Sequence, residues 1–212
     1  MSKQTVSERL FAGFCDTNGV RYSRVIPGVG RSPDFVITLG GVEVTCEVKQ
    51  IDPNAEDLKE LAELRQTGSA GRFVANRLRG KLKDVSAQLK KASRAGHPTL
   101  LVVYDNTPFK TYSDHADVVR AMFGRHSVTV LVPDDPSLPT AALAPFLGAD
   151  RGIGPAHNTA VSAVAILDGS LDRAAALRVY HNPHTAVRLD PALFKGLPVS
   201  QPVLPDATEV SL

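Results

Sequence analysis

The residues with the clearest chemical potential lie in one short stretch, SPDFVITLGGVEVTCEVKQ, residues 32–50. Asp34 opens a first apolar run, and Glu47 and Lys49 come near the end of a second. Side chains alternate between the two faces of a strand, so Glu47 and Lys49 share one face while valines and a cysteine occupy the other. A strand pair that looks suited to burial therefore carries a carboxylate and an ammonium group side by side.

The glycine pair 40–41 separates the two runs and predicts a tight hairpin turn, because glycine adopts the positive φ angles that such a turn requires. If the residues that flank the turn pair with each other, counting along both runs places Asp34 opposite Glu47. Opposed carboxylates repel, and burial increases the cost. Either exposure of this sheet face to solvent or a bound cation relieves the repulsion between the two carboxylates. Mg²⁺ commonly takes one or two carboxylates from a protein, and the alternative is an ordinary surface pair of Glu47 with Lys49.

Apolar periodicity predicts helices and strands along most of the chain. Helices are expected at residues 2–19, 55–66, 72–94 and 113–124. Strands are expected at residues 20–26, 34–39, 42–51, 98–106, 127–133, 160–167 and 177–182. A meander of three strands followed by helical crossovers predicts an α/β fold with a mixed central β-sheet flanked by helices. We expect a core at residues 1–132 and a C-terminal extension at 133–212 on the same domain, with a proline-rich surface tail from about 191.

Two motifs in the hairpin resemble the signature of a known nuclease superfamily. Pro33-Asp34, followed on the paired strand by Glu47-Val48-Lys49, is similar to the signature of the PD-(D/E)xK nuclease superfamily, which has a restriction-endonuclease-like fold. That fold has an αβββαβ core. The elements expected for residues 3–105 follow the same order, apart from an additional helix at 55–66, and a strand pair is added beyond them.

The resemblance implies a role for each residue of the motif. Asp34 and Glu47 would bind Mg²⁺, with Mn²⁺ as a substitute, and the backbone carbonyl of Val48 would complete the protein ligands. Lys49 would orient or help deprotonate the attacking water and steady the negative charge on the phosphate. Glu8, on the first helix, stands where many members carry a glutamate near the metal, and it would hold a water of the metal or a second metal ion. The alternative for Glu8 is a glutamate on the helix surface.

The helix expected at 72–94 is strongly basic, with eight Lys and Arg residues and one acidic residue, Asp84. Such surfaces bind phosphate backbones through the release of counterions, and the alternative is a solvated helix face. The residues that we expect to contact nucleic acid are Arg31 in the loop before Asp34 and, on the helix, Arg77, Arg79, Lys81, Lys83 and Gln88.

Composition sets limits on the other functions. The net charge of +2 is too small to identify a partner. Two cysteines without a CxxC motif argue against a disulfide framework or a structural zinc site. No apolar run approaches the length of a membrane span, so we expect a cytoplasmic protein.

Taken together, these features predict a Mg²⁺-dependent nuclease that cuts DNA, most naturally as an endonuclease, with RNA as the second choice of substrate. Many relatives of this fold act as dimers, which leaves a homodimer open. The alternative is a non-catalytic nucleic-acid-binding or assembly module that retains the fold.

Overall fold

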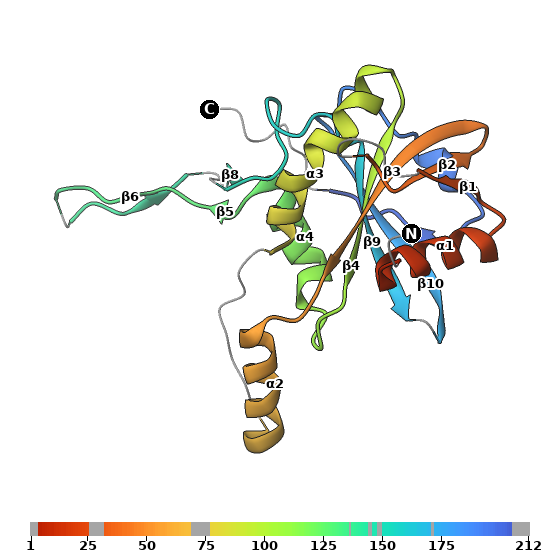
Figure 1. Cartoon of the computed structure of the whole chain (residues 1–212). Coiled ribbons are helices and arrows are strands. Elements are labelled where there is room, and N and C mark those ends of the chain that lie inside the picture. Colours follow the sequence, from red (N-terminus) through yellow and green to blue (C-terminus); the bar gives the residue numbers. More distant parts are fainter. Residues whose placement is uncertain are drawn as a thin grey trace.

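We describe the protein from a computed structural model of the whole chain (Figure 1). The described residues are 4–25, 32–68, 77–135, 137–143, 146–147, 150–170 and 172–204, without the side chains of 85–88, 111, 126–127 and 146–147. The helices are α1 (Val6–Thr17), α2 (Ala55–Thr67), α3 (Arg77–Arg94), α4 (His115–Phe123) and the short 3-10 helices η1 (Thr111–Ser113) and η2 (Pro191–Phe194). The strands are β1 (Arg21–Arg24), β2 (Phe35–Leu39), β3 (Val42–Ile51), β4 (Thr99–Asp105), β5 (His126–Ser127), β6 (Val130–Leu131), β7 (Ala141–Ala142), β8 (Phe146–Leu147), β9 (Ala163–Ser170), β10 (Arg173–His181) and β11 (Val199–Ser200).

Seven of the strands form one mixed sheet, in the order β1-β2-β3-β4-β9-β10-β11. Neighbours are antiparallel at β1–β2, β2–β3 and β9–β10, and parallel at β3–β4, β4–β9 and β10–β11. Figure 1 shows α1 on one side of this sheet and α3 with α4 on the other. The predicted α/β fold, a mixed central sheet flanked by helices, is therefore confirmed.

The sheet separates two apolar cores. On the α1 side, the ring of Phe11 meets that of Phe35 edge-on, with centroids 5.4 Å apart. On the opposite side, α3 buries leucines such as Leu82 and Leu89 against β4 and α4. Every residue of β4 is buried, which suits the continuous apolar run of a strand covered on both faces.

The hairpin of β2 and β3 has the predicted register. Leu39 pairs with Val42, and Gly40 and Gly41 have φ angles of 53° and 86°. Positive φ at both turn residues suits a type I′ turn, whose twist matches that of the paired strands. The β3 residues on the α1 side are Val44, Cys46 and Val48. Alternation therefore turns Glu47 toward the face that α3 covers.

Two elements project from the body of the molecule (Figure 1). One is α2, the helix predicted at 55–66, in which only Asp57 is buried. The other is a ribbon in which β5 pairs with β8 and β6 with β7. The sequence predicted a single strand at 127–133, and this was wrong: the run is split between β5 and β6, and both lie outside the central sheet. The position beside β4 is taken by β9 instead.

The chain beyond Pro191, for which the sequence predicted a surface tail, is ordered against the sheet as far as residue 204. Asp190 caps η2 by accepting the N–H of Ala192 at 2.9 Å, and the side chain of Phe194 is buried in the α1 core. β11 then pairs in parallel with β10. Low periodicity concealed this segment because a proline-led turn and two strand residues leave no repeating pattern. Residues 205–212 lie outside the described residues.

Candidate functional site

The carboxylate of Asp34 lies at the end of the hairpin ladder, next to the backbone of β3. The backbone N–H of Asp34 donates to the carbonyl of Cys46 at 3.1 Å. Oδ2 of the Asp34 side chain accepts the N–H of Val48 at 2.8 Å. The β2–β3 ladder ends at the Phe35–Cys46 pair, and Asp34 lies in a bend just before β2. The predicted position of Asp34 opposite Glu47 stays a prediction. Both carboxylates therefore belong to one end of the hairpin, just where β2 begins.

Glu47 and Lys49 form an ion pair on the β3 face that α3 covers. The ammonium of Lys49 donates to Oε1 of Glu47. The side chain of Glu47 is only 1% exposed, whereas that of Lys49 is 27% exposed. This burial distinguishes the pair from the ordinary surface pair that was the alternative, because burying a carboxylate costs free energy unless a charge compensates it.

Strand geometry also determines where the carbonyl of Val48 points. Thr45 donates its N–H to the Pro98 carbonyl, on the β4 side of β3. The carbonyl of Cys46 and the N–H of Val48 face the other way, toward Asp34. Because the N–H and C=O of one strand residue point to the same side, the Val48 carbonyl also lies on the side of Asp34, beyond the end of β2.

These donors fit a hard divalent cation. The described residues contain no group of three or more His, Cys, Asp or Glu side chains that could hold a metal. Asp34, Glu47 and the Val48 carbonyl instead offer two carboxylates and one backbone oxygen. Mg²⁺ accepts such a sparse oxygen set, because it retains several waters and takes its remaining ligands from phosphate. A zinc site would require nitrogen or sulfur ligands here.

Electrostatics at Asp34 favour a positive partner. Burial raises the pKa of Asp34 above its ordinary value, and the N–H of Val48, Lys49 and Arg24 each offset only part of that rise. Desolvation therefore dominates, and the ionised carboxylate has a cost that the surrounding groups do not cancel. A cation placed between Asp34 and Glu47 would favour the ionised form of both.

Glu8 lies close to this site but is already paired. Its Oε2 accepts from the guanidinium of Arg24 at 2.9 Å, and its side chain is 16% exposed. Arg24 in turn acts to lower the pKa of Asp34, so it links Glu8 to the hairpin electrostatically. Arg24 was missed from the sequence, where it is one of two arginines in a short polar strand and carries no distinguishing signal.

Gln50 connects the site to α1. Its Oε1 accepts the N–H of Ser7, in the first turn of α1, at 3.0 Å. Its Nε2 donates to Asp52 at 2.5 Å. Alternation along β3 turns Gln50 away from Lys49, and its contact with α1 agrees with this. The residue directly after Lys49 thus fixes the helix that carries Glu8.

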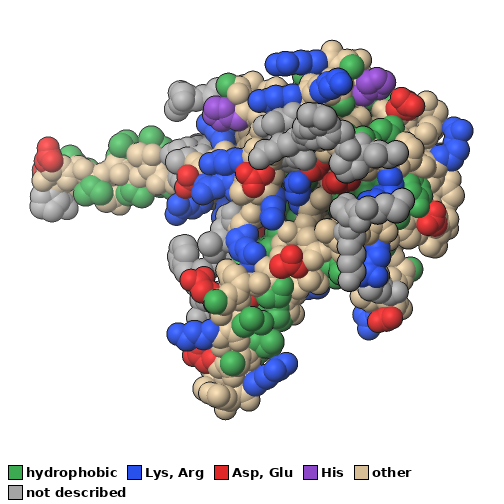
Figure 2. Space-filling model, viewed as in Figure 1, with side chains coloured by type: hydrophobic (Ala, Val, Ile, Leu, Met, Phe, Trp, Pro, Cys, Tyr) green, Lys and Arg blue, Asp and Glu red, His purple; other side chains and the backbone are tan. Residues whose placement is uncertain are grey.

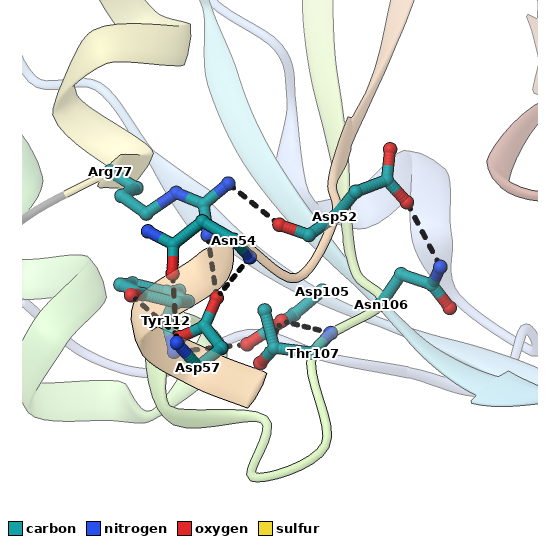
Figure 3. Close-up of polar contacts among 8 residues, drawn as sticks. All are labelled: Asp52, Asn54, Asp57, Arg77, Asp105, Asn106, Thr107 and Tyr112. Atoms are coloured by element: carbon teal, nitrogen blue, oxygen red, sulfur yellow. Dashed lines mark hydrogen bonds and ion pairs between the residues drawn. The ribbon is translucent and has the colours of Figure 1, made fainter. Parts of the chain in front are cut away.

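A polar network closes the carboxyl ends of β3 and β4 (Figure 3). Asp57 is fully buried and pairs with Arg77 at 3.0 Å. It also completes a capping box with Asn54, in which each backbone N–H donates to the other's side chain at 2.8 Å. The hydroxyl of Tyr112 donates to Asp57 at 3.3 Å, and its ring lies 5.1 Å from the guanidinium of Arg77. The start of α2 is thereby fixed against the start of α3.

Asp52 forms the exposed side of the same network. Its carboxylate accepts from Asn106 at 2.9 Å, and its backbone carbonyl accepts from Arg77 at 2.7 Å. Burial acts to raise the pKa of Asp52, but the bonds from Asn106 and Gln50 and the nearby Lys81 outweigh it, so the pKa lies below its ordinary value. Asp52 therefore favours its ionised form, three residues beyond Lys49. Sequence reasoning missed it because it looked like a loop residue.

The residues predicted to contact nucleic acid fall into two groups. Arg77 and Arg79 are engaged within the chain, Arg77 in the network and Arg79 with Asp150 at 2.9 Å. Lys81 is half-buried on the side of Asp52, and Lys83 is exposed. Figure 2 shows Lys and Arg side chains gathered over the part of the body where α3 lies. Arg31 and the side chain of Gln88 lie outside the described residues.

Comparison with known proteins gives no assignment. Neither protein-family models, curated proteins nor solved structures match the chain. No helix in the described part of the chain combines the length and the apolar character needed to cross a membrane.

Proposed function

We propose that this chain is a Mg²⁺-dependent nuclease that hydrolyses phosphodiester bonds, with DNA as its substrate. The observation that carries the proposal is the buried carboxylate of Glu47, paired with Lys49 and followed by Val48, whose N–H donates to Asp34. The resemblance of these residues to the PD-(D/E)xK signature supports it. The order from α1 to β4 agrees with the core of a restriction-endonuclease-like fold once α2 is treated as an insertion.

Each residue of the site has a distinct task in this proposal. Asp34, Glu47 and the Val48 carbonyl would hold the cation, and bound Mg²⁺ would polarise the phosphoryl oxygens and stabilise the charge that develops on them. Lys49, whose side chain is 27% exposed, holds its ammonium beside Glu47. From there it orients the attacking water and offers a positive charge to the phosphate. Glu8 acts indirectly, because its partner Arg24 modulates the charge of Asp34.

DNA binding rests on α3. Its residues include seven Lys and Arg and one acidic side chain. Arg77 and Arg79 are used within the chain, so the phosphate contacts fall to the other basic residues of α3, of which Lys83, Lys90, Lys91 and Arg94 are exposed. Since α3 and Glu47 lie on the same side of the sheet, a duplex bound along α3 would pass the hairpin end. Each phosphate contact contributes to a salt-dependent affinity.

The first test is nicking of supercoiled plasmid in Mg²⁺ or Mn²⁺. We expect the wild type to nick, and Asp34→Asn and Lys49→Ala to lose at least 100-fold in rate, which is the order expected for removing a transition-state contact or proton-transfer group. Glu43→Gln is the matched control, since it removes an exposed carboxylate from the same face of β3, near the turn. It should cut at the wild-type rate. A structured RNA substrate run in parallel would show whether the site distinguishes DNA from RNA.

A second readout separates the metal site from the chemistry. If Mg²⁺ binds with a dissociation constant of about 1 mM, 10 mM Mg²⁺ stabilises the fold by about 1.4 kcal/mol, which raises the Tm by roughly 3–5 °C for a chain of this size. Asp34→Asn should abolish this shift. A shift without cleavage would favour the binding-module alternative or a more specialised substrate. The absence of both the thermal shift and cleavage would refute the nuclease proposal.

A further inference from the structure

The ribbon formed by residues 126–147 exposes an unusual amount of apolar surface. Figure 1 shows it projecting away from the sheet. Its exposed apolar side chains are Val128 (50%), Val130 (54%), Leu131 (52%), Val132 (72%), Leu138 (55%) and Leu143 (46%). Residues 126–149 contain no Lys or Arg, and their acidic residues are Asp134 and Asp135. Figure 2 shows the same composition, with apolar side chains along the ribbon and acidic ones at its tip. Such a surface suits a protein partner and repels nucleic acid.

The outer edge of β6 is available for strand pairing. Among the described residues, β6 has β7 as its one neighbouring strand. An isolated two-stranded ribbon is marginally stable in water, and an uncharged edge rich in valine is a template for pairing with another chain. The stretch from Val128 to Val132 contains no charge and no proline. A protein that keeps such an edge exposed needs a partner to cover it.

Hydrogen bonding within the ribbon identifies the backbone groups that face outward. The carbonyl of Thr129 accepts the N–H of Leu143 at 2.9 Å, so Thr129 directs its backbone groups toward the β7 side. Because backbone direction alternates along a strand, the N–H and C=O groups of Val128, Val130 and Val132 point to the outer edge. Their side chains also share one face of the ribbon.

We propose that a second copy of this chain pairs with this edge, antiparallel, about a two-fold axis through Val130. Two symmetry-related edges can exchange hydrogen bonds only where outward-facing groups meet outward-facing groups, which limits the register to alternate positions. With the axis at Val130, the two copies of Val130 exchange bonds with each other, and Val128 pairs with Val132 of the second copy. The two ribbons then form one four-stranded antiparallel sheet whose central valines lie together on one face.

Charge selects this register over the next permitted one. With the axis at Val130, the bend that carries Asp135 of each copy lies toward Arg125 of the other, since both residues are five positions from the centre. In that bend the Asp135 carboxylate also accepts from Ser137. Arg125 is 65% exposed and pairs with Asp150 at 3.0 Å within its own chain, so Asp135 would join an existing acidic partner around one guanidinium. The other register, centred on Leu131, sets Asp135 against the uncharged Ser127. An isologous contact of this kind closes on itself and forms a dimer rather than a fibre.

Cysteine cross-linking tests the register directly. Paired residues that exchange hydrogen bonds across an antiparallel pair have Cα atoms about 5.5 Å apart, within the range that a disulfide spans. Val130→Cys should therefore form a covalent dimer under mild oxidation. Val128→Cys is the matched control, because the two copies of residue 128 lie about 14 Å apart in this register. We expect at least tenfold faster cross-linking for Val130→Cys. The native Cys15 and Cys46 are both buried and contribute little background.

Sedimentation of the full chain tests the dimer itself. We expect twice the monomer mass for the wild type, and a monomer for Val130→Pro, which removes an outward-facing N–H while leaving the β6–β7 bonds in place. Val130→Ala keeps that N–H and should stay a dimer. A monomeric wild type, or equal cross-linking of Val128→Cys and Val130→Cys, overturns the proposal. None of these readouts requires nuclease activity, so the two proposals can fail independently.

Discussion

Replacing Asp57 by alanine should destabilise the protein more than most single substitutions. Asp57 has no exposed surface, and its carboxylate accepts from Arg77 at 3.0 Å, from the N–H of Asn54 at 2.8 Å and from Tyr112 at 3.3 Å. Asp57→Ala leaves all three donors without this acceptor. The guanidinium of Arg77 is the costliest of them, because it remains charged beside an apolar methyl group.

The magnitude follows from the burial of the two partners. Removing one member of a buried ion pair costs about 3–5 kcal/mol. The side chain of Arg77 is 26% exposed and keeps its bond to the Asp52 carbonyl, so solvent recovers part of its hydration. We therefore expect a loss of about 3 kcal/mol, part of which is the bond from the Asn54 N–H, one half of the capping box. Against a typical total of roughly 5–15 kcal/mol, this is a large fraction.

Urea denaturation followed by circular dichroism measures this loss. Glu56→Ala is the matched control, since it removes an exposed carboxylate from the same first turn of α2 and should change the free energy of unfolding by less than about 0.5 kcal/mol. Asp57→Asn keeps an oxygen for the Asn54 N–H but loses the charge, and should fall between the two. If Asp57→Ala matched Glu56→Ala, the network would not be holding α2 and α3 together, and the reasoning would be refuted.

Three further predictions concern single sites. Burial raises the pKa of the Cys15 thiol to about 12 and that of Cys46 well above its ordinary value, so neither should react with a thiol reagent at pH 8 until the chain is unfolded; rapid native labelling would contradict this. Gly40→Ala should cost about 1–2 kcal/mol in urea denaturation, because φ is 53° and the new methyl would lie 2.9 Å from Leu193 Cδ2. Burial raises the folded-state pKa of Asp34, so its contribution to stability is present below the unfolded pKa of about 3.9 and is lost as pH rises through the higher folded value. Asp34→Asn should therefore gain stability relative to wild type across that window, and a pH-independent difference would exclude this cause.

The hairpin could be predicted because its determinants are local. The glycine pair 40–41 sets the turn, and strict alternation on either side sets the register, so the pairs from Leu39–Val42 to Phe35–Cys46 follow from counting. The burial of Glu47 could not be predicted in this way. It depends on α3 covering that face of the sheet, and α3 begins thirty residues later in the chain.

The contacts of the basic helix α3, by contrast, could not be predicted from local sequence. A count of charges along residues 72–94 cannot tell which cations are neutralised within the chain. The partners of Arg77 and Arg79 are Asp57 and Asp150, which lie 20 and 71 residues away. Only the tertiary fold brings them together, so two of the predicted DNA contacts have a structural use that no local pattern indicates.

The ribbon shows that an apolar run does not by itself predict a buried strand. The run at 127–133 is apolar, β-branched and uncharged, which favours a strand of the central sheet. β9 takes that position because its own apolar run, 163–167, is buried against both cores. A sheet position has room for one strand, and the sequence of each run alone does not decide between competitors.

At the end of the hairpin, groups of the chain itself partly compensate the two carboxylates, which suits a site that is formed before a cation binds. Each carboxylate has a local partner: Glu47 accepts from Lys49, and Asp34 accepts from the N–H of Val48. Both carboxylates thus have a donor within the chain, unlike the ligands of small domains that fold only when metal binds. The rise in the pKa of Asp34 shows that the compensation is incomplete. A cation would supply the remainder, while Lys49 opposes it as a like charge. This balance argues for a weakly held Mg²⁺ that gains its full set of ligands when a phosphate is present, which is the behaviour the proposed reaction requires.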